Sequence, residues 1–218
     1  MICRYLELLE TIHALAVRAG RNPDEVRLLA VTKYFGTPQI DALAEMGCRD
    51  FGENRLPVFS EKVQFFSERA DFRWHFIGPL QKNKARRVLK MADWIHSGES
   101  LELLQTLDRV SAEENLQKKV LVEINLGGEE NKHGFSREAF EAAWEEIQQL
   151  SHLRIVGLMG MTSLDADEKK AHAQFSLLRE IRDAFLPGGE LSMGMSHDYP
   201  IAIEEGATIL RIGSALFD

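Results

Sequence analysis

The stretch that decides the fold is residues 28–54, LLAVTKYFGTPQIDALAEMGCRDFGEN. It opens with the apolar run Leu28-Leu29-Ala30-Val31, continues through an amphipathic pattern at 37–46, and returns to a short apolar run at 50–52. Short apolar strands joined by amphipathic helices are typical of parallel sheets with crossover helices. The stretch therefore predicts one strand–helix–strand unit of a parallel α/β sheet.

The same alternation runs through the rest of the chain. Strands are predicted at 28–32, 50–52, 72–77, 94–96, 120–125, 155–159, 190–193 and 208–212, with helical patterns between them near 37–46, 54–68, 80–91, 100–114, 136–150, 166–185 and 198–205. Eight such units predict a closed (β/α)8 TIM barrel, an α/β fold. An extra N-terminal helix precedes it, with apolar positions at Leu6, Leu9, Ile12, His13 and Ala16. The alternative is an open, doubly wound sheet, which would show the same alternation.

Composition limits the class of protein. The 218 residues carry 26 basic and 34 acidic side chains, a formal charge of −8, which excludes a nucleic-acid binder that works through bulk positive charge. No run approaches ~18 apolar residues, and no signal-peptide pattern opens the chain, so neither a membrane span nor a targeting segment is expected. The only cysteines are Cys3 and Cys48, without a CxxC motif. We expect one domain over residues 1–218 in the cytoplasm.

Polar residues follow the predicted strands, at the rim where barrel enzymes place their chemistry. Lys33 directly follows the first apolar run. In a partly buried mouth, desolvation would lower the pKa of its ammonium and expose a nucleophilic amine, as a Schiff-base lysine requires. The alternative is a lysine paired with a rim carboxylate such as Glu53 or Glu123.

The last two strands end in segments suited to a phosphate. Arg211-Ile212-Gly213-Ser214 ends the eighth strand, and Ser192-Met193-Gly194-Met195-Ser196 ends the seventh. Glycine allows backbone amides to approach an anion closely, and a short helix opening after Gly213 would favour one at its N-terminus. The alternative is an ordinary glycine-containing turn with a capping serine.

Three further features are given no chemistry. The seven histidines include no HxH or HExxH pair, and His75 and His96 fall on different strands, so no metal is expected. A basic group after the third strand is interpreted as a solvated helix face, although a polyanion or partner protein could use it. It comprises Lys82, Lys84, Arg86, Arg87 and Lys90. Lys132 is interpreted as a surface lysine, with a second carbonyl-accepting role left open.

Taken together, six segments resemble the pyridoxal-phosphate homeostasis protein family, single-domain barrels related to the N-terminal domain of alanine racemase, the fold-type III group. The segments are Ala30-Val31-Thr32-Lys33, Phe51-Gly52-Glu53-Asn54, His75-Phe76-Ile77-Gly78 with Leu80-Gln81 and Asn83-Lys84, Gly157-Leu158-Met159, Ser192-Met193-Gly194-Met195-Ser196 with Asp198, and Arg211-Ile212-Gly213. They span almost the whole chain in the family's order.

The resemblance implies a site for pyridoxal 5′-phosphate (PLP). It implies that Lys33 forms the internal aldimine, that Arg211 faces the pyridine nitrogen, and that Asn54 lies beside the ring. It further implies that the phosphate is held by Ser196, Gly213 and Ser214. An always-charged arginine at the pyridine nitrogen disfavours ring protonation and weakens the cofactor as an electron sink.

The chain departs from the family pattern at three places. Pro79 stands where a short polar residue is usual, Lys33-Tyr34-Phe35 replaces Lys-Thr-Lys, and Ser214 replaces a common threonine. Serine keeps a hydroxyl donor, so phosphate binding is still expected. The bulky Tyr34-Phe35 pair makes the mouth of the site more aromatic.

The function that the resemblance implies is vitamin B6 homeostasis. The protein would hold PLP on Lys33 without substantial turnover and release it to apo PLP-dependent enzymes, as a monomer or weak dimer. The alternative is a fold-type III racemase or decarboxylase, but racemases of that group need a further β domain and an opposing acid/base, and this chain ends six residues after Ile212. A phosphosugar enzyme using Lys33 would not explain the combined motifs.

Overall fold

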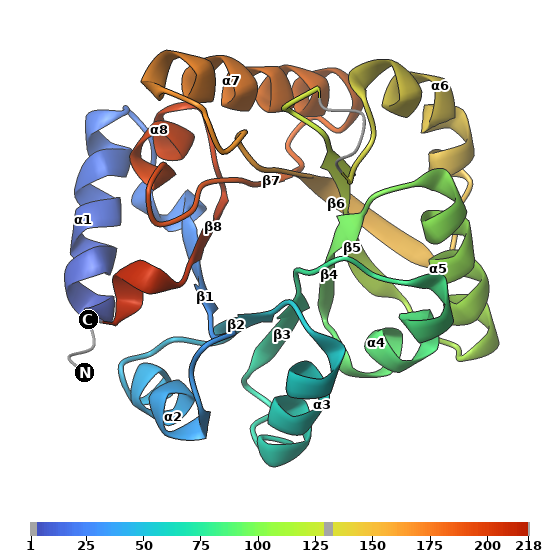
Figure 1. Cartoon of the computed structure of the whole chain (residues 1–218), viewed down its shortest axis with the longest axis horizontal. Coiled ribbons are helices and arrows are strands. Elements are labelled where there is room, and N and C mark those ends of the chain that lie inside the picture. The colour runs from blue at the N-terminus through green and yellow to red at the C-terminus, as the bar shows by residue number, and fades with distance from the viewer. Residues whose placement is uncertain (1–3, 129–132, 218) are drawn as a thin grey trace.

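Eight parallel strands close into a barrel that helices surround (Figure 1). The computed structural model describes residues 4–128 and 133–217. The strands are β1 (Arg27–Val31), β2 (Asp50–Glu53), β3 (Arg73–Phe76), β4 (Trp94–Gly98), β5 (Lys118–Ile124), β6 (Leu153–Gly160), β7 (Glu190–Ser192) and β8 (Ile209–Ile212). Each pairs with the next, and β8 pairs with β1, with Leu28 opposite Leu210. This closure confirms the predicted barrel, because an open sheet would have two edge strands, each paired on one side only.

Helices connect the strands on the outside of the barrel. They are α1 (Tyr5–Arg18), α2 (Thr37–Glu45), α3 (Leu56–Phe65), α4 (Ala85–Met91), α5 (Leu101–Glu113), α6 (Arg137–Gln148), α7 (Glu168–Phe185) and α8 (Tyr199–Glu204). Three short 3-10 helices are η1 (Pro23–Glu25), η2 (Lys82–Lys84) and η3 (Ser214–Leu216). No helix in the described ranges is long and apolar enough to cross a membrane.

Two predicted helices differ in detail. The pattern at 80–91 forms η2 followed by the shorter α4. In α1 the predicted apolar face was wrong in part: Leu6 is 53% exposed, whereas Tyr5 and Leu8 are buried together with Ile12 and Ala16. The buried face of α1 packs against α8 and η3, and Figure 1 shows α1 beside α8. Tertiary packing therefore selects a neighbouring stripe of the same amphipathic helix.

The barrel interior combines apolar and polar side chains. Its apolar cluster consists of Leu29, Trp94, Leu121, Met159 and Ile209. Further buried side chains on the strands are polar: Asp50, His75, His96, Ser192 and Arg211. Branched apolar residues dominate most TIM-barrel interiors, and a polar group placed there destabilises the fold unless it is hydrogen-bonded. The partners of these side chains therefore decide how the barrel tolerates them.

Candidate cofactor site

A cavity of about 390 Å³ opens at the carboxyl ends of the strands. Its wall takes residues that end or follow β1, β2, β3, β6, β7 and β8. All six residues predicted for the site line it: Lys33, Asn54, Ser196, Arg211, Gly213 and Ser214. The remaining lining residues are Val31, Tyr34, Ile77, Gly78, Pro79, Met161, Met195 and His197. The fold thus gathers residues that are as much as 183 positions apart, from Val31 to Ser214, around one cavity.

Lys33 lies where the chain leaves the barrel. The preceding Thr32 is still buried, because its backbone N–H donates to Gly52 O at 3.0 Å. Lys33 itself is exposed, with Nζ 5.0 Å from the centre of the Tyr34 ring. The predicted burial of this ammonium was therefore wrong, since strand pairing ends one residue before it. Lys33 nevertheless lines the cavity.

Glu53 is paired with a lysine that the sequence reading did not single out. Lys62, on α3, is buried, and its Nζ lies 2.5 Å from Glu53 Oε1 and 2.7 Å from Thr32 O. Thr32 Oγ1 donates to the same Glu53 oxygen at 2.6 Å. The alternative pairing of Lys33 with Glu53 is thus excluded, and among the residues that the structure describes no carboxylate pairs with Lys33.

Arg211 is the fixed cation of the cavity. Its Nη1 donates to Ser192 O at 2.6 Å and to Ser192 Oγ at 2.7 Å, and its Nη2 donates to Gly160 O at 3.0 Å. Burial lowers the pKa of Arg211 to about 10, against the opposing effect of the nearby carboxylates Glu123 and Asp198. The guanidinium therefore stays charged at neutral pH, held between β6 and β7.

The loops after β7 and β8 are tied together beside Arg211. Ala215 N donates to Ser196 Oγ at 3.3 Å, which joins the two loops. Asp198 holds the first loop in shape, because its Oδ1 accepts from Met195 N at 2.6 Å and its Oδ2 accepts from Thr162 Oγ1 at 2.8 Å. These bonds hold together the two loops whose Ser196 and Ser214 line the wall of the cavity.

Glycine allows the loop after β3 to lie against Asn54. A Cβ added at Gly78 would lie only 2.1 Å from Asn54 O, far inside contact distance. The close approach brings Asn54, Ile77 and Pro79 into the same wall. The glycine of the third-strand motif therefore has a packing reason that needs no ligand.

A second cavity, of about 290 Å³, lies next to the first and shares four of its lining residues, Ile77, Pro79, Met161 and Met195. Its wall also contains the buried carboxyl of Glu123, on β5. Burial raises the pKa of Glu123 to about 7, and the neighbouring carboxylate of Glu99 is the second cause. Arg211 and His133 act in the opposite direction. This side chain can therefore gain or lose a proton near neutrality beside the candidate site.

The features that were given no chemistry are placed as follows. Three cations of the basic group pair with acids on and just after α5: Lys82 with Glu102, Arg86 with Glu113 and Glu114, and Lys90 with Glu114. These ion pairs favour the interpretation of the basic group as a solvated helix face. Lys132 and Cys3 lie outside the described residues. Cys48 is a buried free thiol.

His75 and His96 lie on different strands, as predicted, but their rings are in contact. They occupy adjacent strands, and His75 Nδ1 lies 3.0 Å from His96 Nε2. Within residues 4–128 and 133–217, no group of three or more His, Cys, Asp or Glu side chains is arranged to hold a metal ion.

The chain is similar to several known proteins. Residues 9–218 match the family described as alanine racemase, N-terminal domain. A pyridoxal phosphate homeostasis protein of Synechocystis is 39% identical over 200 residues, covering 89% of this chain and 92% of that protein. One from Aquifex aeolicus is 36% identical and covers 98% and 96%.

Two solved structures are similar in fold. PipY of Synechococcus elongatus, solved with PLP bound, superposes with a TM-score of 0.83 at 33% identity, covering 95% of this chain and 99% of PipY. An alanine racemase of Clostridium difficile gives a TM-score of 0.73 at 13% identity, covering 97% of this chain and 59% of the racemase. The second likeness concerns the fold alone.

Replacing Glu123 by glutamine will change how stability depends on pH. The folded-state pKa lies above the unfolded value near 4.5, so the folded protein binds more protons and loses stability as pH rises from about 5 to 8. Glu123→Gln removes this loss, at most about 3 kcal/mol. Urea unfolding at pH 5 and pH 8 measures it: relative to wild type, the variant gains stability at the higher pH. An equal difference at both values would contradict the raised pKa.

Proposed function

The chain belongs to the alanine racemase N-terminal domain family and, within it, to the pyridoxal phosphate homeostasis proteins, and from this premise we propose that it binds PLP on Lys33 and maintains the supply of that cofactor. One observation carries the proposal: the six residues that motif resemblance assigns to PLP line a single cavity. PipY, which covers almost the same length at 33% identity, was solved with PLP bound.

The residues of the cavity suit the chemical groups of PLP. When bound, PLP supplies an aldehyde that condenses reversibly with a lysine amine, with loss of water, to a C=N bond. Lys33 offers that amine, free of any carboxylate partner among the described residues. Ser196, Gly213 and Ser214 would hold the phosphate through hydroxyl and backbone donors, and Asn54 would lie beside the ring.

Arg211 favours storage over catalysis. Its pKa of about 10 keeps it protonated at neutral pH, and its hydrogen bonds to β6 and β7 leave it little freedom to move. A guanidinium facing the pyridine nitrogen would keep that nitrogen unprotonated, so the ring would withdraw electrons weakly. Carbanion chemistry would be poor, whereas exchange of one amine for another would remain available.

A catalytic role is the second candidate, and Glu123 is the observation that favours it. A carboxyl with a pKa of about 7 beside the cofactor cavity is suited to general acid/base chemistry. Such a group would serve a fold-type III racemase or decarboxylase. The storage and catalytic roles differ in whether an amino acid is turned over.

We further propose that the recipients are apo PLP-dependent enzymes and that the protein acts in the cytoplasm as a monomer or weak dimer. The net charge of −8 supports partners other than nucleic acid. Because the cavity opens at the rim of the barrel, a bound cofactor could leave without unfolding the domain.

Attachment of PLP to Lys33 is tested by borohydride reduction. Wild-type protein mixed with PLP will absorb visible light, and reduction followed by peptide mass spectrometry will place the adduct on Lys33. Lys33→Ala will lose both signals. Lys84→Ala, which removes an exposed lysine outside the cavity, will keep them. A wild-type protein that stays colourless with added PLP would overturn the proposal.

Storage and catalysis are separated by two measurements on the PLP-loaded protein. Incubation with a panel of amino acids in deuterated water will give no sustained exchange of the α-hydrogen. Mixing with an apo PLP-dependent enzyme will restore its activity at least as fast as the same amount of free PLP does. Sustained exchange that Glu123→Gln abolishes would establish the catalytic candidate instead.

A further inference from the structure

A line of hydrogen bonds begins at the amino-terminal rim of the barrel, opposite the cofactor cavity. There Arg73 and Asp50, the first residues of β3 and β2, form a two-point ion pair, with Nε–Oδ1 at 2.7 Å and Nη2–Oδ2 at 2.5 Å. Asp50 Oδ1 also lies 3.0 Å from His75 Nε2. His75 is 1% exposed, so the line enters the barrel interior at once.

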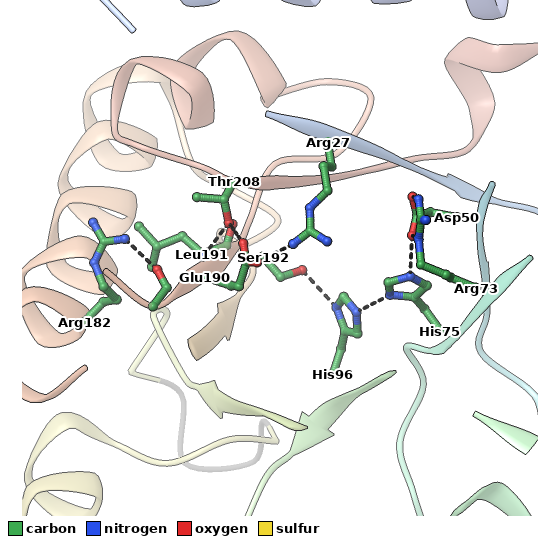
Figure 2. A network of polar contacts seen from close by, with 11 residues as sticks. Arg27, Asp50, Arg73, His75, His96, Arg182, Glu190, Leu191, Ser192 and Thr208 are labelled. Carbon is green, nitrogen blue, oxygen red and sulfur yellow. Dashed lines mark hydrogen bonds and ion pairs between the residues drawn. The ribbon is translucent and has the colours of Figure 1, made fainter. Parts of the chain in front are cut away.

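The line continues across the interior to Arg211. His75 Nδ1 lies 3.0 Å from His96 Nε2, and His96 Nδ1 lies 2.9 Å from Ser192 Oγ (Figure 2). Ser192 Oγ then accepts from Arg211 Nη1 at 2.7 Å. His96 and Ser192 are fully buried. We call Asp50, His75, His96 and Ser192 the relay.

The two ends of the relay fix the direction of every bond in it. Arginine has no acceptor, so Arg211 donates to Ser192 Oγ, whose own hydrogen is then available to His96 Nδ1. A neutral His96 must carry its hydrogen on Nε2 and donate to His75 Nδ1. His75 in turn carries its hydrogen on Nε2 and donates to the Asp50 carboxylate, which has no donor. One arrangement of hydrogens therefore satisfies every polar atom of the line.

Burial keeps both histidines in that neutral form. Burial lowers the pKa of His75 and lowers that of His96 well below its usual value, with the neighbouring His75 as the next cause for His96. Each ring nitrogen nevertheless has a partner at 2.9 to 3.0 Å. A fully satisfied buried network is rigid, and the loss of one member leaves the next without its partner.

We propose that the relay residues are positioning residues for Arg211, and that they couple the Arg73–Asp50 ion pair on the amino-terminal rim to the cofactor cavity. This rests on the proposed function in that PLP is the ligand that reports on the cavity. In TIM barrels the amino-terminal rim usually serves stability alone. Here the same rim would also set the orientation of the cation that faces the cofactor.

The direction of the hydrogen bonds in the relay is tested on the protein without PLP. Side-chain nitrogen spectra of 15N-labelled protein at pH 7.5 report which ring nitrogen of each histidine carries hydrogen. The expected result is that His75 and His96 are both neutral and protonated on Nε2. A hydrogen on Nδ1 of either ring, or a charged ring, would overturn the proposed relay whatever the protein binds.

Coupling along the relay is tested by PLP affinity in a double-mutant cycle. Asp50→Ala and Ser192→Ala each remove a side-chain oxygen that holds the line near one of its ends, so each alone will weaken PLP binding about 3- to 10-fold. The double variant will bind PLP about as tightly as whichever single variant binds it less tightly. Asp71→Ala is the matched control, because Asp71 pairs with Arg69 and Arg49 just before β3 but does not touch the relay. It will leave PLP affinity unchanged, and combined with Ser192→Ala it will give the affinity of Ser192→Ala alone.

A second pair of variants, both at His96, tests the coupling even if one of the first variants fails to fold. His96→Gln keeps one acceptor and one donor and will stay within about twofold of wild type, whereas His96→Phe keeps only the ring and will bind as weakly as Ser192→Ala. Independent effects of Asp50→Ala and Ser192→Ala, or equal affinity of the two His96 variants, would overturn the coupling. A wild-type protein that binds no PLP would instead defeat the proposed function, while the nitrogen spectra would still decide the relay.

Discussion

The buried guanidinium of Arg211 is the constraint on which the site depends. It reaches from β8 to the carbonyl oxygens of Gly160 on β6 and Ser192 on β7, so three strands must keep their relative positions for its hydrogen bonds to form. A charge in this position is tolerated because every one of those acceptors is fixed by the barrel. The same bonds leave a cation in the wall of the cavity, where it can attract an anionic ligand.

The two lysines near the end of β1 show how one fold separates a buried, paired amine from an exposed one. Lys62 is buried against Glu53 and Thr32 O, and it neutralises the carboxylate that would otherwise attract Lys33. Breaking such a buried pair would leave an uncompensated charge, so Lys62 is held in place by a large penalty. Lys33 is left exposed at the mouth, where an amine can meet an aldehyde. The availability of Lys33 is therefore a consequence of where Lys62 lies.

Much of the fold and the site could be predicted because it depends on patterns that are local in sequence. The eight apolar runs and the motifs carrying Lys33 and Arg211 are continuous segments, and closure of the barrel brings their ends together. What could not be predicted depends on side-chain direction across strands. The contact of His75 with His96 follows from strand register. The Lys62–Glu53 pair follows from the packing of α3 against β2, and the exposure of Lys33 from where strand pairing ends, and no single segment specifies these. The misjudged face of α1 has the same origin, since docking against α8 decides which stripe is buried.

A crystal structure of the protein soaked with PLP will decide whether one cavity holds PLP between Lys33 and Arg211. We expect density continuous with Lys33 Nζ, the pyridine nitrogen facing Arg211, and the phosphate against Ser196, Gly213 and Ser214. Clear density for PLP at any other place, with Lys33 turned into solvent and this cavity filled only by water, would contradict it.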